Sequence, residues 1–94
     1  MITTNGKPQS DVMFQVSLEQ MYQVILFNDD INDCEYVVEC LISIFKHPLA
    51  LAVKIMLEAH ERGRAIAEVE SKALAIQHTA ALHRAGLDAK AEAI

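Results

Sequence analysis

Residues 22–33 read YQVILFNDDIND, an almost unbroken apolar run that ends in a cluster of five polar side chains around Ile31. The run over 22–27 is rich in β-branched and aromatic residues, so it predicts a strand with one face buried, or both. A segment of helical periodicity follows the cluster. Asn32 suits the N-cap position of that helix, and Glu35 three residues later completes the pattern of a capping box. We therefore expect a strand, a polar turn and a helix in direct succession.

The rest of the chain continues this alternation of periodicities. Pro48 suits the first position of a second helix and Gly63 its end, while Ser71 caps a third helix that ends at Gly86. After the first helix, which closes at 46–47, the expected elements are a helix over 49–63, a strand over 64–69, a helix over 71–86 and a short edge strand within 87–94. The order β-α-α-β-α-β predicts a small α+β domain whose antiparallel sheet packs against helices.

Helical spacing also predicts which side chains of the first two helices face the core. They are Tyr36, Val37, Leu41, Ile44 and Phe45 in the first helix, and Leu49, Ala52, Val53, Met56 and Leu57 in the second. Residues 1–20 are expected to form a flexible N-terminal extension, because Gly6 and Pro8 interrupt any early element. The core domain is then expected to span residues 21–94.

Length and composition fit one compact domain. The chain has 94 residues, of which 52% are hydrophobic, so it can bury a core and is not a disordered linker. The net charge of −5 leaves no basic stripe for phosphates, and nucleic acid is therefore not an expected partner.

The two cysteines and the apolar runs bear on the cellular setting. Cys34 and Cys40 form neither a CxxC motif nor a zinc-ligand spacing, which favours a reduced, cytoplasmic environment. No apolar run approaches the ~20 residues that span a bilayer, and the N-terminus lacks a signal pattern. We expect no membrane attachment.

The sequence contains no clear catalytic or metal-binding motif. No register of NDDINDCEYVVE places a Gly at the sixth position of a calcium loop, and there is neither a GxSxG motif nor a glycine-rich phosphate loop. Asp29, Asp30 and His60 would make a three-ligand metal site, and a metal-dependent hydrolase is the alternative that uses them. We expect no metal and no cofactor.

His60 lies one turn before Gly63 on the flank of an apolar helix face. A histidine near a helix C-terminus is usually a favourable partner of the helix dipole. If the first strand and the second helix are neighbours, however, His60 would approach Asn28 and Asp29. An imidazole, an amide and a carboxylate can each accept a hydrogen bond from a primary ammonium. Beside an apolar hole, they would recognise a peptide N-terminus with its first side chain, and spacing alone leaves both readings open.

Three blocks of sequence together resemble one family. The strand end VILFNDD, the helix start EYVV and the helix end MLEAHERG occur in the order found in the ClpS family of bacterial adaptor proteins. The resemblance covers roughly residues 22–70. It implies a ClpS-like fold, related to the C-terminal domain of a ribosomal stalk protein. It also implies a non-enzymatic adaptor that binds N-degron substrates, which carry a bulky hydrophobic N-terminal residue, and delivers them to the ClpA-type AAA+ unfoldase of the ClpAP protease.

The resemblance also implies the site. Asn28, Asp29 and His60 would hold the α-ammonium group of the substrate, and Asp30 would support the loop or meet the next peptide unit. The pocket for the first side chain would be lined by Asn32, Cys34, Val37, Met56 and Ala59.

Two departures from the family pattern have functional consequences. Asn32-Asp33-Cys34 replaces a common Thr-Pro-Met, and the smaller Cys34 side chain implies a wider or differently selective pocket. Ala73 and His78 stand where the family often has acidic and basic groups that face the chaperone. The alternative function is therefore a ClpS-like regulator that docks on a Clp chaperone or another complex without binding N-degrons.

Overall fold

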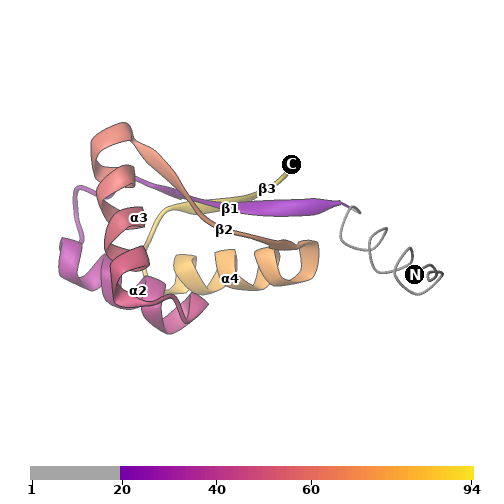
Figure 1. Cartoon of the computed structure of the whole chain (residues 1–94), viewed down its shortest axis with the longest axis horizontal. Helices are drawn as coiled ribbons and strands as arrows, with labels where there is room; N and C mark the ends of the chain where they lie inside the picture. Colours follow the sequence, from indigo (N-terminus) through magenta and orange to yellow (C-terminus); the bar gives the residue numbers. More distant parts are fainter. Residues whose placement is uncertain (1–19) are drawn as a thin grey trace, which may run out of the picture.

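The computed structural model describes residues 20–94. Its elements, in chain order, are β1 (Met21–Phe27), α2 (Cys34–Phe45), α3 (Leu49–Arg62), β2 (Arg64–Ser71), α4 (Lys72–Arg84) and β3 (Ala89–Ala93) (Figure 1). This order confirms the α+β class and the β-α-α-β-α-β arrangement. The expected extension over 1–20 falls almost wholly outside the described residues, so the division into extension and core domain stays a prediction.

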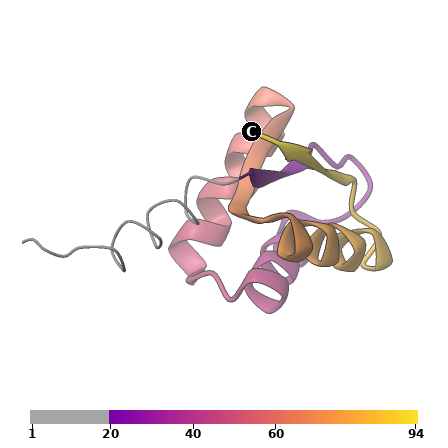
Figure 2. The same cartoon turned by 90° about the vertical axis from the view of Figure 1, so that its right-hand side faces the viewer.

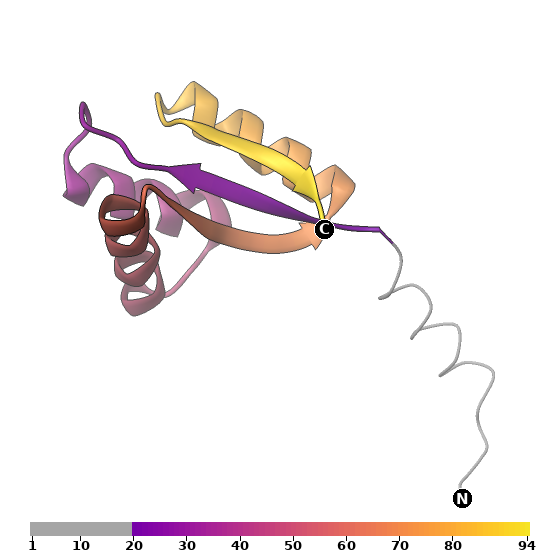
Figure 3. The same cartoon turned by 90° about the horizontal axis from the view of Figure 1, so that it is seen from above.

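β1 is the central strand of the sheet, whose order is β2-β1-β3. Both neighbours run antiparallel to it, with Phe27 opposite Arg64 in β2 and Leu26 opposite Ala89 in β3. Figure 2 shows that α2 and α4 lie beneath one face of the sheet, and Figure 3 shows α3 along the outer side of β2. This arrangement brings the carboxyl end of β1 next to the carboxyl end of α3.

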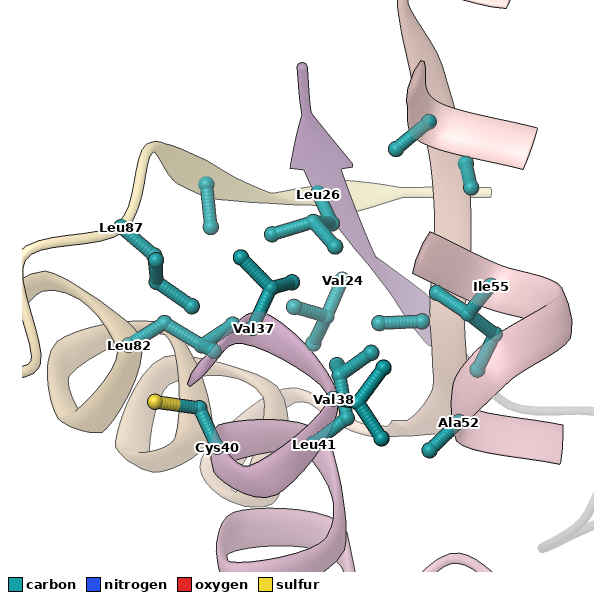
Figure 4. Packing of buried hydrophobic residues seen from close by; sticks show 14 of the residues in the cluster. Val24, Leu26, Val37, Val38, Cys40, Leu41, Ala52, Ile55, Leu82 and Leu87 are labelled. Atoms are coloured by element: carbon teal, nitrogen blue, oxygen red, sulfur yellow. The ribbon is translucent and has the colours of Figure 1, made fainter. Parts of the chain in front are cut away.

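The core lies between the sheet and the helices. Val24 and Leu26 of β1 project into it and meet Val37 and Leu41 of α2 and Leu82 of α4 (Figure 4). Ile25, between them in the strand, is only 3% exposed but lies outside this core cluster, and Gln23 and Phe27 are partly exposed. Each such aliphatic side chain contributes about 1.5–3 kcal/mol on burial.

The predicted inner faces of the helices are partly wrong. Val37, Leu41 and Ala52 are buried as expected, but Tyr36, Leu49 and Leu57 are 40%, 64% and 44% exposed. The positions that are buried instead are Val38, Cys40, Ile55 and Ala59. In a helix as apolar as LALAVKIMLEA, several stripes satisfy the helical period. In α3 the buried stripe consists of Ala52, Ile55 and Ala59, which belong to the core cluster.

The ends of α3 and α4 follow the sequence signals with two changes. Gly63 ends α3 in the left-handed region at φ 92°, and the Ser71 hydroxyl accepts a hydrogen bond from the Leu74 main-chain nitrogen at 3.3 Å, as expected. Pro48 is the N-cap of α3 rather than its first helical residue. α4 ends at Arg84, two residues before the left-handed Gly86. Within the described residues, no helix is both long enough and apolar enough to cross a membrane.

Candidate functional site

The end of β1 is tied directly to the end of α3. The main-chain nitrogen of Asn28 donates to the carbonyl oxygen of Gly63 at 2.9 Å, one residue beyond the Phe27–Arg64 pair. His60 precedes Gly63 by three residues, so this bond places it beside the polar cluster that follows β1. The proximity of His60 to Asn28 and Asp29, which spacing alone could not establish, is a consequence of the β1–β2 pairing.

One pocket collects the residues that the sequence singled out. It has a volume of about 270 Å³, its open mouth included, and its lining residues are Leu26, Phe27, Asn28, Asp29, Asn32, Cys34, Val37, Met56, Ala59 and His60. Eight of these ten residues were expected from sequence, while Asp30 does not line the pocket. Leu26 and Phe27 were missed, although they directly precede Asn28 on the strand.

The Asp29 carboxylate organises the polar side of the pocket. Its Oδ1 accepts hydrogen bonds from the main-chain nitrogens of Ile31 at 2.8 Å and Asn32 at 2.9 Å. Its Oδ2 accepts one from the Asn32 side-chain amide at 2.7 Å. A carboxylate offers about four acceptor positions, so Oδ2 keeps a lone pair for a further donor. The turn and the carboxylate therefore hold each other in place, with one acceptor position left for a ligand.

These hydrogen bonds control the ionisation of Asp29. Partial burial raises the pKa of its carboxyl group, but the Asn32 side chain and the main-chain N–H groups of Asn32 and Ile31 lower it by more. The net pKa lies below the ordinary value, because every one of these donors favours the charged form. The pocket thus contains a fixed negative charge at neutral pH.

Asn32 does not cap α2, and this corrects the capping-box prediction. The N-cap is Asp33, with φ −64° and ψ 147°, and its side chain makes no capping hydrogen bond. The Asn32 amide instead donates both to Asp29 and to the carbonyl oxygen of Gly86, at 3.1 Å from the latter. A cap requires the side-chain oxygen to accept from the helix, whereas this amide uses its donors to join the pocket to the α4–β3 turn.

Asn28 and Asp30 form a second contact at the same turn. The Asn28 side-chain nitrogen donates to Asp30 Oδ1 at 3.2 Å. This bond uses the amide nitrogen, so the amide oxygen of Asn28, a residue that lines the pocket, remains available as an acceptor. Asp30 is exposed and supports the loop through this bond.

Among the remaining lining residues, His60 and Cys34 are exposed, and Val37 and Ala59 are buried and apolar. His60 is exposed, and no hydrogen bond to another described residue fixes its ring. Cys34 is the first residue of α2, and its free thiol is exposed at the pocket. Val37 and Ala59 form a nearly inaccessible floor, at 5% and 3% exposure, with Met56 beside them.

The polar side chains do not form a metal site. Among residues 20–94, no three side chains of His, Cys, Asp or Glu lie close enough to hold a metal ion. Asp29, Asp30 and His60 therefore do not meet in the way the hydrolase alternative requires. An acceptor-lined mouth above an apolar floor instead suits a ligand that carries an ammonium group next to an apolar side chain.

Ala73 and His78 differ in orientation on α4. Ala73 is exposed, whereas the His78 side chain is 19% exposed and its Nδ1 lies 2.7 Å from Oε2 of Glu70. The His78 ring also meets Phe45 edge-on, with 4.8 Å between ring centroids. His78 thus joins α4 to β2 and α2, and it offers little charge to the surface.

Comparisons with known proteins point to one family. Residues 17–90 match the family model described as ATP-dependent Clp protease adaptor protein ClpS. The Clp protease adapter ClpS of Lawsonia intracellularis is 35% identical over 74 residues, which cover 79% of this chain and 68% of the relative. The ClpS of Leptothrix cholodnii is 38% identical over 76 residues, with coverages of 77% and 66%.

A solved structure shows the same fold. Agrobacterium tumefaciens ClpS2 bound to L-phenylalaninamide superposes with a TM-score of 0.70 and 27% sequence identity, over 80% of this chain and 98% of that one.

Proposed function

This chain belongs to the ClpS family of ATP-dependent Clp protease adaptors, and we propose that it binds N-degron substrates and delivers them to the ClpA-type unfoldase of the ClpAP protease. The substrate determinants are a free N-terminal amine and a bulky hydrophobic first residue. The observation that carries this proposal is that one pocket is lined both by the polar Asn28, Asp29 and His60 and by the apolar Val37, Met56 and Ala59.

The chemistry of the mouth matches an α-ammonium group. Its three N–H donors pair with three acceptors: the Asn28 amide oxygen, the open lone pair of Asp29 Oδ2 and a ring nitrogen of neutral His60. A buried charge that is left unpaired costs several kcal/mol, so nearly complete pairing is needed for tight binding. The fixed charge of Asp29 supplies the counter-ion.

The floor supplies the affinity for the first side chain. Transfer of a Leu or Phe side chain from water into this pocket contributes about 1.5–3 kcal/mol. L-Phenylalaninamide, the ligand of the similar ClpS2 structure, combines a free amine with an aromatic side chain in one small molecule. Its binding to a protein of this fold supports the same ligand class for the present pocket.

Delivery of a substrate requires a second surface on this protein, one that contacts the chaperone. As a Clp protease adaptor, the protein has a Clp chaperone as partner, and the exposed side of α4 around Ala73 is the surface that we assign to it. With His78 turned toward Glu70, this surface relies on apolar contact more than on charge.

The decisive experiment is fluorescence anisotropy with three labelled peptides that are identical except at the N-terminus. One begins with free Leu, one with N-acetylated Leu and one with Ala. We expect saturable binding of the free Leu peptide alone, because acetylation removes the charge and two donors. Asp29→Ala and His60→Ala should abolish that binding.

Asp33→Ala is the matched control for Asp29→Ala. Asp33 is an exposed carboxylate in the same turn, but it does not line the pocket and makes no side-chain cap. Its loss should leave peptide affinity within about twofold, since surface changes of this kind are usually small. Chaperone binding without any peptide binding would refute the proposal and favour the regulator that docks without an N-degron.

A further inference from the structure

Ile31 is an unusually exposed apolar residue at the edge of the pocket. It is 92% exposed, whereas the other exposed large apolar side chains among residues 20–94 range from 38% to 67%. Single exposed apolar side chains are common on protein surfaces, so exposure alone assigns no role. Two further features of Ile31 point to a role: its position beside the pocket and the hydrogen bonds that hold its turn.

The turn that carries Ile31 is fixed before any ligand binds. The main-chain nitrogens of Ile31 and Asn32 both donate to Asp29 Oδ1, at 2.8 and 2.9 Å. The Asn32 side chain then ties this turn to Gly86 at 3.1 Å. An apolar side chain on such a preformed turn can be covered by a ligand at a small entropic cost.

The turn also borders the mouth of the pocket. Asp29 and Asn32 line the pocket on either side of Ile31 in the sequence. A peptide whose ammonium group and first side chain fill the pocket must place its second residue at the mouth, since consecutive Cα atoms are about 3.8 Å apart. In an extended peptide, the second side chain points away from the first. It therefore lies outside the pocket, at the mouth that this turn borders.

We propose that Ile31 is a specificity-determining residue for the second position of the substrate, where it favours an apolar side chain. This inference rests on the proposed N-degron function and names the substrate more narrowly, as a peptide with apolar residues at positions one and two. The contact covers the Ile31 side chain, which no other part of the described structure covers.

The test compares peptides that begin Leu-Leu and Leu-Ser and are otherwise identical. We expect the unmodified protein to bind the Leu-Leu peptide about three- to tenfold more tightly, as partial burial of two apolar side chains allows. Ile31→Ser should reduce that ratio to about one, mainly by weakening the Leu-Leu peptide. Ile94→Ser is the matched control, because Ile94 is an isoleucine beyond the end of β3 that is 67% exposed and does not line the pocket.

The outcomes separate this inference from the proposed function. Tight binding of both Leu peptides with no difference between them, or a difference that survives Ile31→Ser, overturns the role of Ile31 and leaves N-degron binding intact. No binding of either peptide overturns both. If Ile31→Ser weakens only chaperone binding, then Ile31 belongs to the chaperone interface and the proposed role is wrong.

Discussion

At the scale of single residues, the pocket depends on how Asp29 and Asn32 share their hydrogen bonds. The Asp29 carboxylate accepts two hydrogen bonds from main-chain nitrogens and one from a side chain. The side-chain amide of Asn32 donates one hydrogen bond to Asp29 and one to the carbonyl oxygen of Gly86. The charged acceptor at the pocket is therefore positioned by a neutral amide that is itself held by a distant carbonyl group. The three bonds to the Asp29 carboxylate are charge-assisted and therefore stronger than neutral hydrogen bonds, whereas the bond from Asn32 to Gly86 is neutral.

Asn32→Ala should raise the pKa of Asp29. The variant removes the side-chain donor that lowers this pKa, while the two main-chain donors remain. The carboxyl resonance of Asp29, followed by NMR during a pH titration, should therefore shift its midpoint upward. Asp33→Ala should leave the midpoint unchanged, and an unchanged midpoint in Asn32→Ala would show that the amide does not control the charge.

Asn32→Ala should also change how the free energy of unfolding depends on pH. The folded pKa of Asp29 lies below its unfolded value of about 3.9, so the carboxylate stabilises the fold above that pH. This contribution is lost as the pH falls through the lowered folded value. Asn32→Ala should narrow this difference, so the free energy of unfolding should depend less steeply on pH in the acid range.

Cys34→Met should narrow the pocket and change its selectivity. The thiol of Cys34 leaves space beside Met56 and Val37 that a longer thioether would fill. We expect the affinity of the variant for peptides that begin with the branched residues Ile or Val to fall by about tenfold or more. Its affinity for peptides that begin with Leu or Phe should change less. Cys34→Ser preserves the volume and should preserve the ranking. An equal loss for all first residues would mean that Met simply obstructs the pocket.

At the scale of elements, the helix ends differ in how well the sequence suits their backbone. α3 ends in Gly63, whose left-handed conformation costs little, but α2 ends in Lys46 at φ 63°. A side chain with a Cβ atom is strained in that region. Lys46 compensates in part, since its Nζ donates to the carbonyl oxygen of Ser43 at 2.9 Å.

Lys46→Gly should stabilise the protein. Removal of the left-handed strain outweighs the lost surface hydrogen bond and the added freedom of the unfolded chain, by about 0.5–1 kcal/mol. Chemical denaturation measures this as a higher midpoint at unchanged slope. Ala85→Gly is the opposite control, because Ala85 ends α4 at φ −82° and gains nothing from glycine. A loss of stability in Lys46→Gly would show that the Ser43 contact dominates.

Prediction from sequence succeeded for elements with strong local signals. The apolar, β-rich run of β1, Gly63 after α3 and Ser71 before α4 each have one local physical cause, and each was found. The roles of Asn32 and Tyr36 were missed because nonlocal contacts decide them: the Asn32 amide reaches Gly86 and the Tyr36 hydroxyl reaches the carbonyl oxygen of Ala85 at 2.7 Å. Asn28, Asp29 and His60 were proposed from their chemistry on the assumption that the first strand and the second helix are neighbours, whereas the other pocket residues were anticipated by the family resemblance alone.

At the scale of the whole molecule, the pocket joins parts of the chain that only the folded state brings together. Its walls come from β1, the following turn, α2 and α3, and Asn32 connects them to the turn after α4. The unfolded chain has no such pocket, so a peptide that fills it binds the folded state alone. Peptide binding and global stability are therefore linked.

A peptide with a free N-terminal Leu should raise the melting temperature of the entire domain. At one hundred times its dissociation constant, a ligand specific for the folded state adds about 2.7 kcal/mol to the free energy of unfolding. For a domain of this size, that corresponds to a shift on the order of 10 °C. Calorimetry should show one cooperative transition that moves as a unit, because the ligand holds β1, α2 and α3 together. His60→Ala should remove the shift without abolishing the transition, since the His60 side chain is exposed and carries none of the core. An equal shift with the N-acetylated peptide would mean that the free amine is not what the pocket recognises.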